Sequence, residues 1–128
     1  MKVTIIHKKS GIGRDEFKMY NKFIKYLQKE FPLKHDLTIT FLGERIGKMT
    51  TGSRLPHDIR VLSKNRMNRD ILRTLAHEWV HEYQMDIEKK EMGPDIGGEN
   101  EDEANSESGA IMKKFEKAFP DSEFKLYE

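Results

Sequence analysis

The chain has 128 residues, of which 36% are hydrophobic and 35% are charged, and it has no cysteine. This length fits a modest core, so we expect a single domain over residues 1–128. The absence of cysteine excludes disulfides, cysteine-ligated zinc and a cysteine nucleophile. No apolar run approaches the ~20 residues of a membrane span, and the apolar stretch near the N-terminus is too short for a signal peptide. We therefore expect a soluble, cytoplasmic protein without a membrane partner.

The net charge of +1 conceals two unlike halves of the chain. Residues 1–73 contain 17 Lys and Arg against 7 Asp and Glu, whereas residues 74–128 contain 6 against 15. Such a split indicates either a pair of oppositely charged surfaces or a basic platform beside an acidic site. Nucleic-acid contact through the basic residues 1–73 is therefore one hypothesis for a partner.

The hydrophobic pattern predicts an α+β fold, in which three main helices pack on a small three- to four-stranded sheet. In chain order, the expected elements are a strand (2–7), an amphipathic helix (14–31), a hairpin of two strands (37–42 and 46–51) joined by residues 43–45, a strand (59–63) and two further helices (68–87 and 100–119).

The second of these helices contains an HExxH motif, His77-Glu78-Trp79-Val80-His81. Two imidazoles four residues apart lie one helical turn from each other and can hold one metal ion, while the glutamate can act as general base. In a chain of this composition, about 0.02 such motifs are expected by chance. At 100° per residue, both histidines project roughly 140° to 180° away from Leu72, whereas Trp79 projects with Leu72. We therefore expect Trp79 in the core and the histidines on another face.

A catalytic zinc ion takes three protein ligands and an open position. No histidine follows His81, so the third ligand should be a carboxylate from residues 99–105. On a helical projection, Glu101 lies within about 40° of the apolar stripe of the third helix, and Glu103 points away from it. Glu101 is the expected ligand, with Glu103 as the alternative. Glu103 also has a structural interpretation, because Asn100 and Glu103 resemble a capping box at the start of the helix.

These residues resemble a known family. LAHEWVHEYQ followed by NEDEAN is similar to the Glu-ligated zinc metallopeptidases (gluzincins), and most similar to the compact ImmA/IrrE type. The resemblance covers roughly residues 59–115. It implies a minimal zincin-like domain, with His77, His81 and Glu101 as zinc ligands and Glu78 as general base. It also implies that Asn105 orients a ligand, and that residues 59–63 are an edge strand to which extended substrate adds.

The expected chemistry is hydrolysis of a peptide bond. Zinc would lower the pKa of a water molecule, Glu78 would take its proton, and the hydroxide would attack the substrate carbonyl. Gln84 projects close to the face of the histidines and is a candidate for orienting a ligand or binding substrate. His57 is a further candidate for this role. The developing oxyanion needs a further donor, for which the sequence leaves four candidates: His57, Tyr83, Tyr127 and Arg60.

The sequence thus predicts a zinc-dependent endopeptidase with Zn²⁺ as cofactor and a protein or peptide as substrate. The alternative is a catalytically degenerate zinc-binding module. Such a module would be regulatory, or would associate with nucleic acid through the basic N-terminal half.

Overall fold

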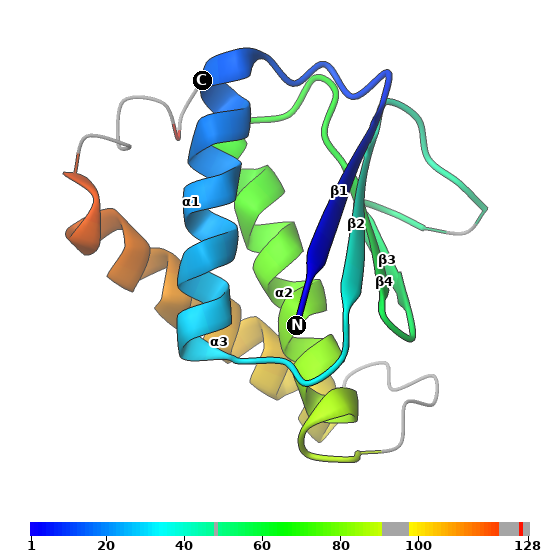
Figure 1. Ribbon diagram of the computed structural model, residues 1–128, viewed down its shortest axis with the longest axis vertical. Helices are drawn as coiled ribbons and strands as arrows, with labels where there is room; N and C mark the ends of the chain where they lie inside the picture. The colour runs from blue at the N-terminus through cyan, green and yellow to red at the C-terminus, as the bar shows by residue number, and fades with distance from the viewer. Residues whose placement is uncertain (48, 91–97, 121–125, 127–128) are drawn as a thin grey trace.

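The computed structural model describes residues 1–47, 49–90, 98–120 and 126, and it has an α+β fold (Figure 1). The helices are α1 (Arg14–Glu30), α2 (Asn68–Asp86) and α3 (Glu99–Ala118), and the strands are β1 (Val3–Lys8), β2 (Leu37–Leu42), β3 (Gly52–Leu55) and β4 (Asp58–Leu62). The expected fold class is confirmed for this part of the chain. None of the helices described there is long and apolar enough to span a membrane.

The four strands form one mixed sheet in the order β1-β2-β4-β3. β1 and β2 are parallel, and α1 makes the crossover that parallel neighbours require. β4 is also parallel to β2, with Ile59 beside Ile39 and Val61 beside Phe41. These four side chains are fully buried, so the centre of the sheet supplies one wall of the core.

The expected hairpin between residues 37–42 and 46–51 is wrong. β2 pairs with β1 and β4, and residues 46–51 form no strand where they are described. Gly47 has a φ of 58°, which a strand does not accommodate, and Ile46 is 48% exposed. The actual hairpin joins β3 to β4 through Pro56 and His57, where proline restricts the first φ and His57 takes a φ of 61°.

The expected position of residues 59–63 at the edge of the sheet is also wrong. β4 lies between β2 and β3, so β3 is the edge strand on this side. Gly52 on β3 lies against α2. A Cβ atom on Gly52 would lie 2.5 Å from Cγ2 of Thr74 and 3.4 Å from Cγ of Glu78. The absence of a side chain therefore brings the backbone of β3 next to the HExxH helix.

The helices lie on one side of the sheet, and α3 packs against both α2 and α1 (Figure 1). Trp79 is completely buried, which confirms its predicted place in the core. Its Nε1–H donates to the carbonyl oxygen of Phe31, the C-cap residue of α1, at 2.9 Å. This bond satisfies one of the carbonyls that a helix end leaves without a partner. Trp79 thus fixes α2 against α1 and leaves the opposite face of α2 for other contacts.

Candidate metal centre

A cavity of about 610 Å³ lies between α2, α3 and β3. α2 contributes His77, Glu78 and His81 to its lining, because these residues share the face of the helix that does not pack on α1. α3 contributes Glu101 and Asn105. The cavity therefore contains every residue that the sequence predicts for zinc binding and for general-base catalysis, apart from the alternative ligand Glu103.

The two histidines and Glu101 converge on one point. Nε2 of His77 lies 2.9 Å from Oε1 of Glu101, and Nε2 of His81 lies 2.9 Å from Oε2. The two Nε2 atoms are 3.2 Å apart. One donor atom from each of the three residues lies within 4.8 Å of the other two. Two imidazole nitrogens and a carboxylate oxygen are the donor set of many catalytic zinc sites.

Gln84 fixes the orientation of His81. Nε2 of Gln84 donates to the carbonyl oxygen of Asn100 and to Oε1 of Glu103, both at 3.0 Å. With its amide hydrogens used in this way, Gln84 presents Oε1 to Nδ1 of His81, at 2.9 Å. Oε1 can only accept a hydrogen bond, so Nδ1 of His81 carries a proton.

The neutral form of His81 then has its lone pair on Nε2, directed at the carboxylate of Glu101. Two electron-rich atoms face each other at 2.9 Å, and only a cation between them or a second proton on the imidazole makes this arrangement favourable. The donor set and the fixed ring of His81 therefore fit a bound metal ion. In metal sites, a ligating histidine usually donates its other ring N–H to an acceptor that fixes its orientation, as Nδ1 of His81 does here to Gln84.

Glu103 does not have the helix-capping role that the sequence analysis predicts. α3 begins after Gly98 as N-cap residue, with no side-chain capping bond, so the capping box of Asn100 and Glu103 is wrong. The Glu103 carboxylate instead accepts hydrogen bonds from Gln84 and Lys90. The bond from Gln84 lowers the pKa of Glu103 below its usual value. Glu103 therefore supports the centre through Gln84, and Glu101 is the carboxylate that meets the histidines.

Burial shifts the pKa values of Glu78 and His77 in opposite directions. It raises the pKa of the Glu78 carboxyl above the usual value, and the nearby negative charge of Glu101 raises it further. A carboxylate with a raised pKa is a better proton acceptor near neutral pH. Burial also lowers the pKa of His77, which favours the neutral imidazole that binds a metal. A side-chain hydrogen bond links His77 to Asn105, the residue expected to orient a ligand.

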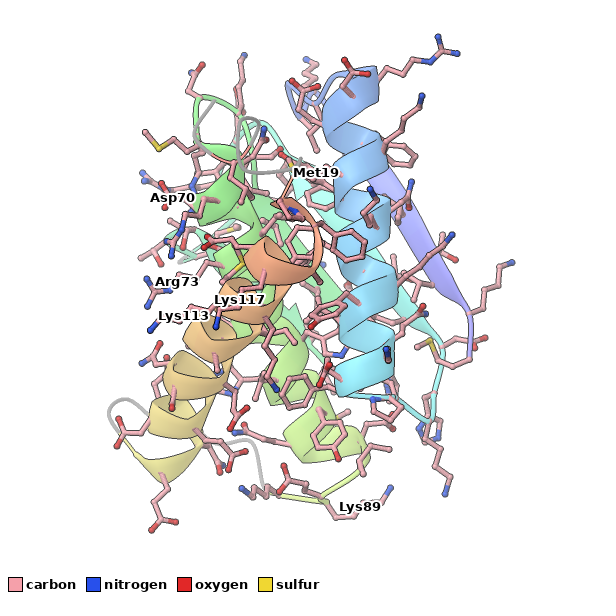
Figure 2. The ribbon with its side chains drawn as sticks, turned by 90° about the vertical axis from the view of Figure 1, so that its left-hand side faces the viewer. Met19, Asp70, Arg73, Lys89, Lys113 and Lys117 are labelled. Carbon is pink, nitrogen blue, oxygen red and sulfur yellow. The ribbon has the colours of Figure 1, made fainter. Side chains whose placement is uncertain are left out.

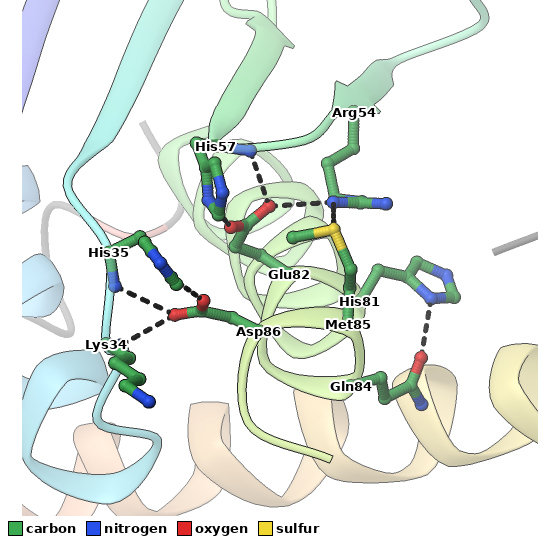
Figure 3. Close-up of polar contacts among 9 residues, drawn as sticks. All are labelled: Lys34, His35, Arg54, His57, His81, Glu82, Gln84, Met85 and Asp86. Atoms are coloured by element: carbon green, nitrogen blue, oxygen red, sulfur yellow. Dashed lines mark hydrogen bonds and ion pairs between the residues drawn. The ribbon is translucent and has the colours of Figure 1, made fainter. Parts of the chain in front are cut away.

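Three of the candidates for stabilising the oxyanion, His57, Tyr83 and Arg60, lie in the described residues and do not line this cavity. His57 binds Glu82 through Nδ1 at 2.7 Å (Figure 3). Tyr83 packs its ring on Phe31, and Arg60 pairs with Asp58. Tyr127 lies outside the described residues.

Sequence reasoning missed the basic lining of the cavity, which comes from Arg54, Arg66 and Arg73. Arg54 is held by Glu82 at 2.7 Å, and Arg66 donates to backbone oxygens and to Thr74. Arg73 points away from the core toward solvent (Figure 2). Part of the positive charge of residues 1–73 therefore surrounds the centre. Nothing in the local sequence marks these arginines, because their place depends on the position of β3 and on the start of α2.

No protein-family model matches the chain, and no curated protein or solved structure is significantly similar to it.

Proposed function

We propose that this protein is a cytoplasmic zinc-dependent endopeptidase of the gluzincin type. The observation that carries the proposal is the convergence of His77, His81 and Glu101 beside Glu78 in one cavity. Two helices supply these groups, and α2 and α3 pack against each other. The resemblance of the two motifs to the ImmA/IrrE type agrees with this arrangement.

His77, His81 and Glu101 would hold one zinc ion. When bound, zinc supplies Lewis acidity, which lowers the pKa of a water molecule and polarises a peptide carbonyl. Gln84 keeps the ring of His81 in the required tautomer. A side-chain hydrogen bond links Asn105 to His77. Glu78 accepts the proton of the attacking water and returns it to the leaving amine, for which its raised pKa is suited.

The edge strand β3 suggests how an extended substrate would bind. Within the described residues, β3 pairs with β4 on one side only, and Gly52 places its backbone beside Glu78. A peptide that adds to the free edge of β3 would therefore run along the cavity, past the general base. Arg73 of α2 also lines the cavity and offers a positive charge to an acidic side chain of such a peptide. An open groove of this kind favours cleavage within a chain.

The test is a comparison of wild type with Glu78→Gln. Both proteins are loaded with zinc, analysed for zinc content and incubated with a mixture of unstructured peptides, whose fragments are identified by mass spectrometry. We expect equal zinc content and a cleavage rate reduced by about 10²–10⁴-fold in the variant. Glu107→Gln, on α3, is the control for the loss of one carboxylate and should cleave at the wild-type rate.

The same experiment separates the alternatives. Wild-type protein that binds zinc through His77 and His81 without cleaving any peptide would support the zinc-binding regulatory module. Wild-type protein that binds no zinc would overturn both the zinc endopeptidase and the zinc-binding regulatory module. The lysines at 18, 22, 25 and 29 on α1 are exposed, and nucleic-acid contact through them stays a prediction. Its test is retention on DNA or RNA that weakens as salt is raised.

A further inference from the structure

A second group of ligating side chains lies on another face of α2, away from the HExxH centre (Figure 3). His35 precedes β2, His57 lies in the turn between β3 and β4, and Asp86 ends α2. One donor atom of each residue lies within 4.8 Å of the donor atoms of the other two. Their imidazole rings lie with centroids 4.8 Å apart.

Backbone amides fix the carboxylate of this group. Oδ2 of Asp86 accepts the backbone N–H of Lys34 at 2.6 Å and that of His35 at 3.0 Å. The other oxygen, Oδ1, faces Nδ1 of His35. Asp86 is 2% exposed, so its charge is held in place by the fold and does not move with a flexible side chain.

Glu82 holds His57 in a similar way. Oε1 of Glu82 accepts hydrogen bonds from Arg54 at 2.7 Å and from the backbone N–H of His57 at 3.0 Å. Oε2 lies 2.7 Å from Nδ1 of His57 and accepts a hydrogen bond from it. This leaves Nε2 of His57 with a lone pair. A carboxylate that orients a histidine in this way is a usual support for a metal ligand.

The backbone at His57 gives an independent reason to assign a role to its side chain. Its φ of 61° is left-handed, a conformation in which glycine is unstrained and other residues are not. The turn nevertheless carries a histidine here, and its imidazole is directed at Glu82. Strained positions of this kind gather at ligand-binding sites.

The burial of the group suits the capture of an ion from solution. The carboxylates of Asp86 and Glu82 are 1% exposed, whereas the side chains of His35 and His57 are 53% and 39% exposed. The negative charge is therefore buried, and the two imidazoles lie on its solvent side at the protein surface. An ion can therefore reach the imidazoles, and water can complete its coordination.

We propose that His35, His57 and Asp86 form a second site for a divalent transition metal such as zinc or cobalt, with Glu82 orienting His57. Imidazole and carboxylate donors favour these metals over magnesium or calcium, which prefer oxygen ligands alone. The site joins the segment before β2, the β3–β4 turn and the last turn of α2. A bound ion would hold the turn that carries the edge strand β3, and so would stabilise one wall of the cavity.

The experiment counts metal ions in a background without the first centre. The double variant His77→Gln/His81→Gln is dialysed against a small excess of zinc chloride and then analysed for zinc. We expect about one zinc ion per chain in this background and about two in wild type. Adding either His35→Gln or His57→Gln should remove the remaining ion. His7→Gln is the matched control, because His7 is outside both groups, and it should leave the zinc content unchanged.

Circular dichroism in the presence of a chelator shows whether each variant is folded, and cobalt absorption gives a second readout, since tetrahedral and octahedral cobalt differ in intensity. A double variant that binds no zinc or cobalt would overturn the second site, whatever the first centre binds. Zinc retained after His35→Gln and His57→Gln would also overturn it. Wild type that holds a single ion, lost only with the His35 and His57 variants, would support this site and count against the proposed catalytic centre.

Discussion

Oε1 of Gln84 lies 2.9 Å from Nδ1 of His81, and this single contact decides which nitrogen of His81 faces the centre. The contact is itself fixed from behind, because Asn100 and Glu103 take both amide hydrogens of Gln84. The residues proposed to bind the metal ion and the residues that orient them are thus linked by hydrogen bonds across the α2–α3 interface. A change at Gln84 should therefore act on metal affinity without removing any ligand.

We expect Gln84→Ala to weaken zinc binding by roughly 10–100-fold, because the ring of His81 loses the partner that fixes its tautomer. Competition with a chromogenic chelator measures this affinity. Gln28→Ala on α1 is the control, since Gln28 is the other glutamine of the chain and its Nε2 donates to the sulfur of Met1 at an exposed position. Equal affinities for Gln84→Ala and wild type would show that His81 needs no such support.

Glu101 and Glu103 allow a matched comparison on one helix. Glu101→Gln should lose most of the bound zinc, because the amide cannot replace a carboxylate between two imidazoles. Glu103→Gln should keep most of it, since an amide oxygen still accepts the hydrogen bond from Gln84. Elemental analysis after dialysis distinguishes the two variants. Zinc that survives Glu101→Gln but not Glu103→Gln would reverse the assignment of the third ligand.

Gly52→Ala tests the close contact between β3 and α2. The new Cβ atom would overlap Cγ2 of Thr74, so we expect a loss of about 1–3 kcal/mol in the free energy of unfolding and slower cleavage. Thr74→Ser removes this methyl group and keeps the hydroxyl that bonds Asp70 and Arg66. The double variant Gly52→Ala/Thr74→Ser should therefore recover much of the loss. Urea denaturation and the peptide assay measure both effects.

Gly109 on α3 is the control for the glycine substitution. Among the described residues, a Cβ atom there comes within 4 Å of nothing beyond its chain neighbours and the adjacent turns of its own helix backbone, so Gly109→Ala should stabilise the protein by about 0.5–1 kcal/mol through helix propensity. If Gly52→Ala proved equally harmless, the edge strand would lie farther from α2 than the structure places it.

Tyr20 gives a prediction for alkaline pH. Its hydroxyl donates to Oδ1 of Asn68 at 2.5 Å, and burial raises its pKa well above the usual value of 10.0. Above pH 10 the unfolded chain loses the tyrosine proton while the native state keeps it, so the free energy of unfolding falls as pH rises. Tyr20→Phe lacks this proton. At neutral pH we expect the free energy of unfolding of this variant to be about 1 kcal/mol below that of wild type. This difference should shrink above pH 10.

Urea denaturation of wild type and Tyr20→Phe at about pH 8 and about pH 10.5 provides the measurement. Tyr26→Phe, on the same helix, controls for the loss of a phenolic hydroxyl. A deficit of Tyr20→Phe that stays constant over this range would contradict a protonated Tyr20 in the alkaline native state.

The helical part of the centre could be predicted because its information is local. The four-residue spacing of His77 and His81 sets their common face, and the apolar stripe of α3 brings Glu101 to the packed side of that helix. The spacing could not show that Gln84 donates a hydrogen bond to Glu103, because this bond forms only when α2 and α3 pack against each other.

The sheet could be predicted only in part because strand order depends on distant pairing. Residues 46–51 have strand-like composition, yet β4 takes the place beside β2 and puts Ile59 and Val61 in the core. Two of the site residues that sequence reasoning missed, Gly52 and Arg54, come from β3, whose edge position follows from this order. The pairing of His57 with Glu82 was missed for the same reason, since 25 positions separate them.

Trp79 is the one tryptophan of the chain, and it stands between the two histidines of the HExxH motif on the opposite face of their helix. Its indole is buried and donates a hydrogen bond to Phe31, so its intrinsic fluorescence reports on the environment of α2. Emission should be blue-shifted in the native state and should respond to any event that rotates or loosens α2. Metal loading, substrate docking and unfolding can therefore be followed in solution without a label.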